Sequence, residues 1–322
     1  MTLTTLTRDA WLEGRKFSIG ASEAAAVCGE SPWLSPLELF ARKLGKMPDP
    51  DLSDVEHVRW GNLLEPAIVA ETADRLKLRL LSVAESAERL ESPEVEIVGA
   101  VEGRQLFLRS HSCPWMVATL DGLAIDEAGA LVSIEAKNTS YWQREDWEGG
   151  EAPVHYLLQV AHQLAVAAPV ARGVLAGLVG GNKLRIVPPI ERAAAPIEEL
   201  RALEADFWRR LQTGEPPRAD HTESSLRALK ALHPDDNGES VTLPLEFAAM
   251  REEIARLEVE NREREERIDA LKIQIREAIG SATFGVLPDG SGTYSLKTQE
   301  RGKRVVKASK FRTLRFSKGK SK

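Results

Sequence analysis

The 322-residue sequence contains only two cysteines, Cys28 and Cys113. Two thiols are too few for a disulfide framework, for a four-cysteine metal site or for an iron–sulfur cluster held by four cysteines. The cysteines are therefore expected to be reduced and the chain to be cytoplasmic. No apolar run is long enough to cross a bilayer, so no membrane association is expected. Residues 1–8 also lack the apolar core of a signal peptide.

Charge is distributed unevenly along the chain. Lys and Arg together number 43 and Asp and Glu 49, a net charge of −6. Residues 301–322 hold ten basic residues and no acidic one, which leaves 33 basic against 49 acidic residues, a net −16, over the rest. A basic end on an acidic body predicts contact with a polyanion. The plainer interpretation is a solubilising tail.

Composition and periodicity divide the chain into four parts. Helical and strand patterns alternate over residues 1–214, which predicts one α/β core. Residues 215–243 include the turn-forming segment 233–238 and predict a linker or loop. Residues 244–280 predict a long amphipathic helix with coiled-coil character, and residues 281–322 a β-hairpin followed by the basic tail.

Within the core, alternating and β-rich segments predict strands at residues 95–101, 105–110, 116–125 and 130–137. The apolar segment 156–168 predicts a helix in which Gln159, His162 and Gln163 are embedded.

The long helix carries a heptad seam. Its positions alternate in spacing between four and three residues and are Met250, Ile254, Leu257, Asn261, Arg264, Ile268, Leu271, Ile275 and Ala278. Such a seam pairs with another helix of this chain or of another subunit. A single amphipathic helix lying on the body fits the sequence equally well.

The segment from Asp121 to Lys137 has the pattern of a hairpin that carries chemistry. Alternate side chains of a strand share a face, so Glu135 and Lys137 should point the same way and Ala136 the other. The hairpin should bring the Asp121 carboxylate beside Glu135. Two carboxylates and a lysine at a sheet end can hold Mg²⁺ and activate a water for phosphodiester cleavage. Without further evidence, two acidic residues and a lysine in this pattern are more often ordinary surface residues than a metal site.

Further motifs occur in a fixed order along residues 10 to 210. They read R-K-F-S-I-G-A-S-E from Arg15, S-P-W-L-S-P from Ser31, W-G-N-L-L-E-P from Trp60, A-T-L-D-G-L from Ala118, I-E-A-K from Ile134, and Y-L-L-Q-V-A-H-Q-L from Tyr156. In this order they resemble the YqaJ-type viral recombinase nucleases, relatives of phage lambda exonuclease in the PD-(D/E)xK superfamily. Leu120 stands where that family usually has proline, at a position that shapes the strand and is not a ligand.

The resemblance implies a restriction-endonuclease-like fold, in which helices flank a mixed, partly antiparallel central sheet. It also implies metal ligands. Asp121, Glu135 and the Ala136 backbone carbonyl would bind Mg²⁺, with Mn²⁺ as a substitute, and Glu65 would be a further ligand of the metal or its water. Hard oxygen ligands suit these ions. Without the resemblance, Glu65 would be taken for an ordinary exposed helix residue.

The other implied roles concern water and the DNA end. Lys137 would orient or help deprotonate the attacking water, and Gln159 would contact the scissile strand or the water, although a core amide is the plainer interpretation. Arg15 and Ser22 would hold a terminal 5′-phosphate. Arginine gives bidentate donors to phosphate, and a serine at a helix N-terminus adds a hydroxyl and free amides.

The activity implied by the resemblance is Mg²⁺-dependent 5′→3′ digestion of linear double-stranded DNA. The 3′ tails would serve a single-strand annealing recombinase. The protein would be encoded by a phage or prophage and would form a homo-oligomer, since members of the family often form rings. Two alternatives stay open: a structure- or sequence-dependent DNA endonuclease of the same superfamily, and a non-catalytic DNA-binding or assembly protein. The intact set of Glu65, Asp121, Glu135 and Lys137 argues against the second.

Overall fold

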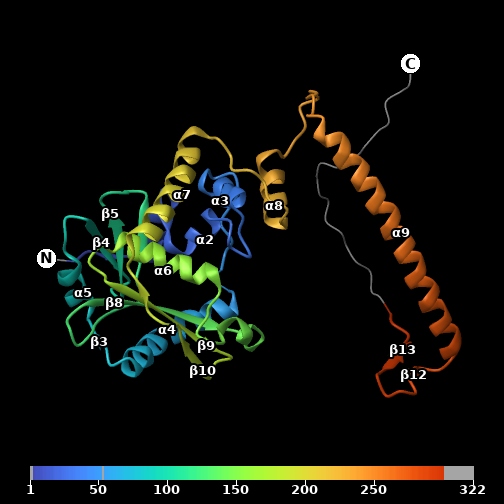
Figure 1. The fold of residues 1–322 in the computed structure, drawn as a ribbon, viewed down its shortest axis with the longest axis horizontal. Coiled ribbons are helices and arrows are strands. Elements are labelled where there is room, and N and C mark those ends of the chain that lie inside the picture. The colour runs from blue at the N-terminus through green and yellow to red at the C-terminus, as the bar shows by residue number, and fades with distance from the viewer. Residues whose placement is uncertain (1–2, 53, 301–322) are drawn as a thin grey trace. The chain divides into compact units, whose positions relative to one another are not determined.

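The computed structural model describes residues 3–52 and 54–300 (Figure 1). The chain divides into two compact units, Met1–Pro234 and Asp235–Lys322, which are described separately below. None of the helices in the described residues combines the length and the apolar character that crossing a membrane requires. The basic tail predicted for residues 301–322 lies outside the described residues.

Unit 1 contains two mixed sheets. In the first, the strand order is β1 (Thr5–Leu6), β4 (Val95–Val101), β5 (Gln105–Ser110), β6 (Met116–Thr119) and β2 (Ile19–Gly20). The neighbours β4, β5 and β6 pair antiparallel, and the two short edge strands pair parallel.

The second sheet has the order β10 (Lys183–Ile186), β9 (Arg172–Val179), β8 (Leu131–Thr139), β7 (Gly122–Ile125) and β3 (Arg79–Leu80), with β11 (Ile190–Glu191) also on β9. Its pairs are antiparallel except β8 with β9. A parallel pair needs a crossover connection, which here consists of the 3₁₀ helix η2 (Tyr141–Trp147) and α6 (Val154–Val166).

Helices cover both faces of the second sheet. The helix α4 (Glu56–Arg75) lies on one face, and α6 lies on the other with α7 (Ala194–Thr213) packed against it (Figure 1). Alternation along β8 explains this, because Val132, Ile134 and Ala136 join the apolar cluster of α4 whereas Leu131 joins that of α6. The predicted α/β core with a mixed, partly antiparallel sheet flanked by helices is confirmed.

The remaining helices of unit 1 are α1 (Arg8–Lys16), η1 (Ala21–Glu23), α2 (Ala24–Val27), α3 (Pro36–Lys43), α5 (Val83–Leu90) and α8 (Glu223–Leu232). The Ser35 hydroxyl caps α3 by accepting from the Glu38 amide, with Pro36 at the first helical position.

The structure differs from the expected linker at residues 215–243. The helix α8 forms inside this range and packs Ala228 against Leu37 and Ala41 of α3. Ser224 also donates to the buried Glu38 carboxylate. The sequence pattern around α8 is short and bounded by turn residues, so its helical state depends on this tertiary contact.

Unit 2 consists of the long helix α9 (Glu246–Ile279) and a hairpin of β12 (Phe284–Val286) and β13 (Thr293–Ser295). Both lie where the sequence predicts a long helix and a hairpin. No residue of α9 is buried.

Candidate functional site

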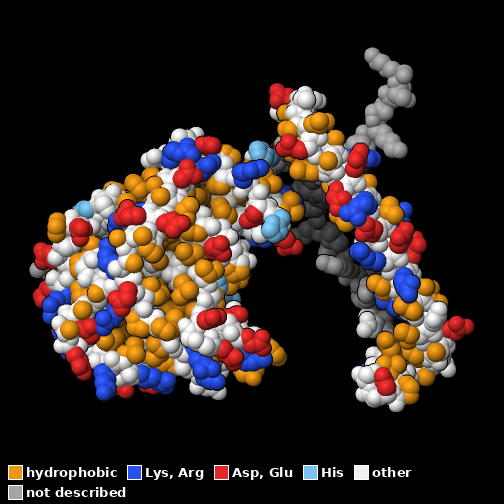
Figure 2. All heavy atoms as spheres, viewed as in Figure 1, with side chains coloured by type: hydrophobic (Ala, Val, Ile, Leu, Met, Phe, Trp, Pro, Cys, Tyr) orange, Lys and Arg blue, Asp and Glu red, His pale blue; other side chains and the backbone are white. Residues whose placement is uncertain are grey.

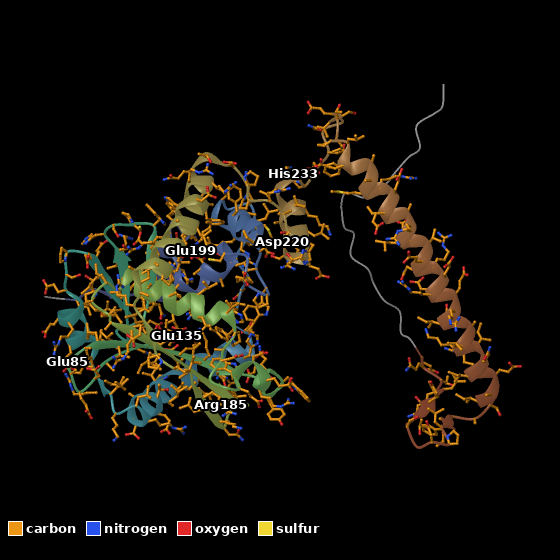
Figure 3. The ribbon with its side chains drawn as sticks, in the orientation of Figure 1. Glu85, Glu135, Arg185, Glu199, Asp220 and His233 are labelled. Atoms are coloured by element: carbon orange, nitrogen blue, oxygen red, sulfur yellow. The ribbon has the colours of Figure 1, made fainter. Side chains whose placement is uncertain are left out.

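The β8 strand presents Glu135 and Lys137 on the face that α6 covers. Ala136 packs on the α4 side, so the alternation predicted from the sequence is present. Glu135 is 1% exposed and lies inside unit 1 (Figure 3). Its carboxylate accepts from Lys137 Nζ at 2.5 Å, Gln159 Nε2 at 2.5 Å and Gln163 Nε2 at 2.6 Å. The cost of burying this charge is thus offset by an ammonium and two amide donors.

Asp121 lies where the two sheets meet. The sequence predicts one strand over residues 116–125, but the structure has β6 in the first sheet and β7 in the second, with Leu120 and Asp121 between them. In the β7–β8 hairpin Gly122 is opposite Ile134. The Asp121 carboxylate therefore reaches β8, where its Oδ2 accepts from the Ala136 amide at 3.0 Å.

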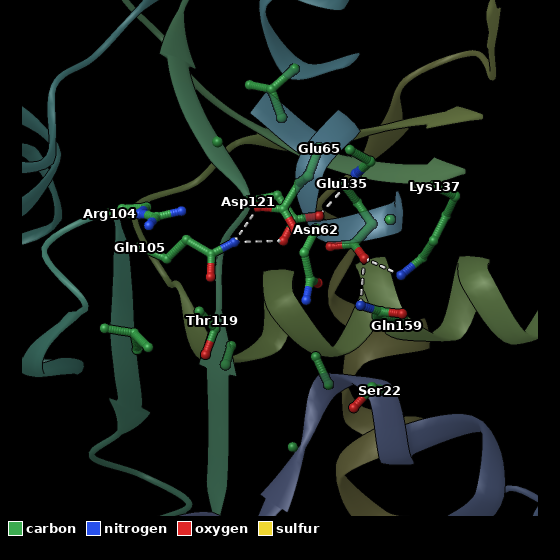
Figure 4. A pocket seen from close by; sticks show the side chains of 18 of the residues that line it. Ser22, Asn62, Glu65, Arg104, Gln105, Thr119, Asp121, Glu135, Lys137 and Gln159 are labelled. Carbon is green, nitrogen blue, oxygen red and sulfur yellow. Dashed lines mark hydrogen bonds and ion pairs between the residues drawn. The ribbon is translucent and has the colours of Figure 1, made fainter. Parts of the chain in front are cut away.

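Glu65 reaches the same point from α4. The helix can approach closely because Gly122 has no side chain: a Cβ there would come within 2.5 Å of Val69 Cγ1. Gln105, at the start of β5, then joins the two carboxylates. Its Nε2 donates to Glu65 Oε1 at 2.6 Å and to Asp121 Oδ1 at 3.1 Å (Figure 4).

The shared site perturbs the ionisation of its members. Burial, followed by the negative charge of Glu135, raises the pKa of Glu65 to about 7. Burial and the charges of Glu135 and Glu65 raise the pKa of Asp121 well above its ordinary value. Burial lowers the pKa of Lys137, but the neighbouring carboxylates outweigh it and hold that pKa above its ordinary value. Crowded carboxylates of this kind favour a positive charge between them.

The donor set fits a hard divalent cation in its chemistry. Three carboxylates and the Ala136 carbonyl are oxygen ligands of the kind that Mg²⁺ and Mn²⁺ prefer. In the described residues, however, no three His, Cys, Asp or Glu side chains stand close enough to share one ion. Amide and ammonium donors take up the oxygens instead, and Gln105 Nε2 lies between Glu65 and Asp121. Holding a cation would require a change of these side-chain hydrogen bonds.

Arg15 and Ser22 lie together beside the carboxylates. Arg15 Nη2 donates to Ser22 Oγ at 2.8 Å, and the guanidinium stacks over the Trp11 ring at 4.9 Å. Gly20 leaves room for it, since a Cβ there would be 2.9 Å from Arg15 Nη2. Ser22 lies just before a helix. It is the second residue of the 3₁₀ turn η1, which follows Gly20 and leads into α2.

One cavity of about 1000 Å³ is lined by all eight residues that the sequence singles out. These are Arg15, Ser22, Glu65, Asp121, Glu135, Ala136, Lys137 and Gln159. The six sequence motifs are distributed between residues 15 and 164, and the fold brings residues from all of them to the lining of one cavity.

Two residues of the site are not found by sequence reasoning. Gln163 stands inside a recognised motif, but nothing in the sequence says that it holds Glu135. Gln105 has no motif around it. Its position at the start of the predicted strand 105–110 does not indicate that its side chain contacts Glu65 and Asp121.

His162 and Cys28 do not line the cavity. His162 is fully buried, with Nδ1 2.7 Å from Glu204 Oε1 and Nε2 3.0 Å from the Val117 carbonyl oxygen. Burial raises the pKa of the Cys28 thiol to about 11, so the thiol is protonated and unreactive at neutral pH. We assign neither residue to the chemistry of the site.

Comparison with known proteins agrees with this arrangement. Residues 10–169 match the model of the YqaJ-like viral recombinase domain. The protein YqaJ of Bacillus subtilis (strain 168) is 27% identical over 292 residues, which cover 88% of this chain and 81% of that protein. Residues 10–169 thus match the family that the motifs indicate, and the resemblance predicted from the motifs is confirmed.

Solved structures with partial similarity include an alkaline exonuclease, LHK-Exo, from Laribacter hongkongensis. It is 18% identical, with a TM-score of 0.46, and the match covers 70% of this chain and all of that chain. The same enzyme in complex with dAMP has a TM-score of 0.47 at 18% identity and the same coverage.

Proposed function

We propose that this protein is a divalent-cation-dependent exonuclease that hydrolyses linear double-stranded DNA from its ends. The observation that carries the proposal is the convergence of Glu65, Asp121, Glu135 and Lys137 in the cavity that also contains Arg15. Carboxylates with raised pKa values beside a partly buried lysine are typical of functional sites. The family assignment supports a nuclease over other classes of phosphate-binding protein.

The cation would be Mg²⁺, with Mn²⁺ as a substitute. Asp121, Glu135, the Ala136 carbonyl and Glu65 would hold it. When bound, it would polarise the phosphoryl group and lower the pKa of the attacking water. Lys137, Gln159 and Gln163 now donate to the buried Glu135 carboxylate, and at least one of these donors would give way to the cation.

Lys137 would act as a cation rather than as a base. Its raised pKa keeps the Nζ protonated at neutral pH, so it can orient the attacking water and stabilise negative charge on the phosphorane. Gln159 would hold Glu135 with its amide nitrogen, which donates to Oε1 at 2.5 Å. Its carboxamide oxygen would be available to the water or the scissile strand.

Arg15 and Ser22 would recognise the end of the DNA. The guanidinium and the hydroxyl are paired with each other at 2.8 Å and line the cavity, where a terminal 5′-phosphate would replace their mutual hydrogen bond. Arginine binds phosphate with strong charge-assisted hydrogen bonds. A phosphate held there would place the first phosphodiester bond of that strand toward the carboxylates, which favours 5′→3′ digestion.

We further propose that digestion leaves 3′ single-stranded tails for a single-strand annealing recombinase, in a phage-type recombination system. A homo-oligomer would keep the enzyme on the duplex during digestion. Residues 1–214 would form the catalytic part of the chain. These proposals rest on family resemblance and on the direction of digestion inferred above.

The alternative within the same superfamily is an endonuclease. Incubation with linear duplexes labelled at either 5′ end, and with covalently closed circular DNA, separates the two. The exonuclease proposal predicts mononucleotide release from linear DNA in Mg²⁺ and an intact circle. Cleavage of the circle at a comparable rate would overturn it in favour of an endonuclease, and no cleavage of either substrate would favour a DNA-binding protein.

A further inference from the structure

The α9 helix exposes a long apolar seam. Its 34 residues span about 51 Å at 1.5 Å per residue. Phe247 extends the heptad seam by one position, to ten positions between residues 247 and 278. The apolar seam residues are about half exposed, with Leu257 at 47% and Ile254 at 54%. Apolar and charged side chains alternate on the surface of this helix (Figure 2). The seam spans more than four heptads, which is longer than the three to four heptads that indicate a coiled coil.

The seam is symmetric about the middle of the helix. The midpoint of Glu246–Ile279 falls between Arg262 and Glu263. If two copies of α9 run antiparallel with their midpoints aligned, each seam residue meets the residue at the same distance on the other side of the midpoint. The resulting layers are Phe247 with Ala278, Met250 with Ile275, Ile254 with Leu271, Leu257 with Ile268, and Asn261 with Arg264. Four of these five layers are wholly apolar, and the polar layer is central.

The polar layer distinguishes the two orientations. A parallel pair would place Arg264 against Arg264 of the second copy inside the seam, and like charges in contact are unfavourable. An antiparallel pair places Arg264 against Asn261 instead. The Asn261 amide nitrogen donates to Glu265 within its own helix at 2.9 Å, which directs the amide oxygen to accept from an arginine.

The residues that flank the seam also distinguish the orientations, because such positions form the charge pairs between coiled-coil helices. Along the middle of a parallel pair the facing flanks are Glu253 with Glu258, Glu260 with Glu265 and Arg267 with Lys272, and all three pairs carry like charges.

An antiparallel pair sets Glu260 beside Arg267 of the second copy, twice by symmetry. On its other flank Glu258 faces Glu265 and Arg251 faces Lys272, so both pairs on that side carry like charges. A parallel pair brings opposite charges together only at its end, where Glu246 faces Arg251, whereas the antiparallel pair does so next to its central layer.

From these observations we propose that α9 pairs with α9 of a second copy of this chain in antiparallel orientation, with the midpoints of the two helices aligned. The proposal goes beyond nuclease activity and does not depend on it. The pairing would also bring the exposed Leu245, which precedes α9, to the end of the pair where Phe284 of the other copy's hairpin lies. Both side chains are exposed within one chain, at 88% and 54%.

Cysteine cross-linking in the full-length protein tests the orientation. One preparation carries Ile254→Cys and the other Leu271→Cys, and the two are mixed and oxidised. Peptide mapping separates the engineered bond from any that involves Cys28 or Cys113. The proposal predicts a 254–271 disulfide between chains in the mixture and none at these positions in either preparation alone. Self-linked 254–254 or 271–271 dimers would mean a parallel pair, and no cross-link would mean that the helices do not meet; either result overturns the proposal.

Charge exchange gives an independent test by sedimentation velocity. Glu260→Arg or Arg267→Glu alone should weaken association about tenfold, because each change replaces two opposite-charge pairs by like-charge pairs. The double variant Glu260→Arg/Arg267→Glu should restore it. A parallel pair responds in the opposite way, since each single change then creates opposite charges across the flank.

The matched control is Glu266→Arg, which makes the same charge change on the side of α9 away from the seam. It should leave association unchanged, and circular dichroism should show equal helix content in all variants. If Glu266→Arg weakens association as much as Glu260→Arg, net charge explains the effect and the proposal fails. Tighter association of either single variant at positions 260 or 267 would overturn it as well.

Discussion

The cavity of unit 1 and the long helix of unit 2 arrange charge in opposite ways. In the cavity the Glu135 carboxylate is 1% exposed and accepts from three donors. In α9 no residue is buried, and charged side chains such as Arg256 and Glu253 pair with each other in water. Buried charge is expensive unless it is compensated, whereas exposed pairs contribute little. In unit 1 compensated buried charge marks the proposed catalytic site, whereas in unit 2 exposed apolar residues at heptad spacing mark the proposed pairing surface.

The largest expected effect comes from removing the positively charged Lys137 side chain from the unit 1 site. Lys137→Ala should lower kcat/KM for linear duplex DNA by about three orders of magnitude, because negative charge on the phosphorane loses its partner. Lys183→Ala, an exposed lysine at the start of β10, is the matched control and should keep full activity. Comparable rates for Lys137→Ala and Lys183→Ala would remove Lys137 from the mechanism.

The second effect concerns the DNA end. Arg15→Ala should reduce the preference for 5′-phosphorylated over 5′-hydroxyl duplexes by about ten- to a hundredfold, the loss of a hydrogen bond between charged groups. Initial rates on the two substrates measure the ratio. Lys16→Ala removes the neighbouring exposed charge, which pairs with Glu13, and should leave the ratio unchanged. An unaltered ratio in Arg15→Ala would place the end-binding pocket elsewhere.

These two predictions use residues that the sequence alone could indicate. Glu135 and Lys137 follow from strand alternation, and their apolar approach predicts burial. Arg15 and Ser22 came only from family resemblance, because no local pattern says that a residue in α1 and one in η1 will meet. Their contact depends on the turn at Gly20.

Other parts could not be predicted from the sequence because they depend on contacts between distant segments. In the sequence, residues 116–125 have the pattern of one continuous strand. The structure divides them at Asp121 into β6 and β7, which pair in two different sheets, and the hydrophobic periodicity does not reveal this division. Gln105 faces Glu65 from 40 residues away. The helix α8 is short and is stabilised by α3.

The third effect is on stability in the absence of metal. The folded pKa of Glu65 is about 7 and its ordinary value 4.5. Stability from this group is therefore present below about pH 4.5 and is lost as the pH rises through 7, because the unfolded state releases the proton first. Allowing for partial exposure, the loss is roughly 1–2 kcal/mol.

Chemical denaturation in EDTA between pH 5 and 8 measures this slope. Glu65→Gln should flatten it, whereas Glu71→Gln, an exposed carboxylate of the same helix, should not. A slope that is the same in wild type and Glu65→Gln would mean that Glu65 does not titrate in this range.

An effect of similar size is expected from the bridging amide of Gln105. Gln105→Ala should destabilise the metal-free protein by about 1–2 kcal/mol, since two carboxylates lose a donor. A divalent cation would compensate for that loss, so adding Mn²⁺ should raise the melting temperature more in Gln105→Ala than in wild type. Gln212→Ala, on the exposed surface of α7, is the control. An equal or smaller Mn²⁺ shift in Gln105→Ala would contradict the bridging role.

The smallest effect is expected from truncating the seam of α9, and a truncation in the core of unit 1 provides the comparison. Ile134→Ala in the α4 cluster should cost unit 1 about 2–5 kcal/mol of stability, as other buried aliphatic truncations do. Leu257→Ala in α9 should change the unfolding of unit 1 by less than about 0.5 kcal/mol, because Leu257 is 47% exposed. Denaturation followed by tryptophan fluorescence reports on unit 1, since all seven tryptophans precede residue 235. A large loss from Leu257→Ala would show that α9 supports the fold of unit 1.

The most direct test of the nuclease site is metal-dependent digestion of a linear duplex by wild type, Glu135→Gln and Glu127→Gln. Both changes neutralise a carboxylate of the same hairpin, but Glu127 is exposed in its turn. The account predicts nucleotide release by wild type and Glu127→Gln in Mg²⁺ and none in EDTA. Glu135→Gln should be inactive in both conditions while its circular dichroism is unchanged. Equal rates for Glu135→Gln and Glu127→Gln, or digestion that persists in EDTA, would contradict it.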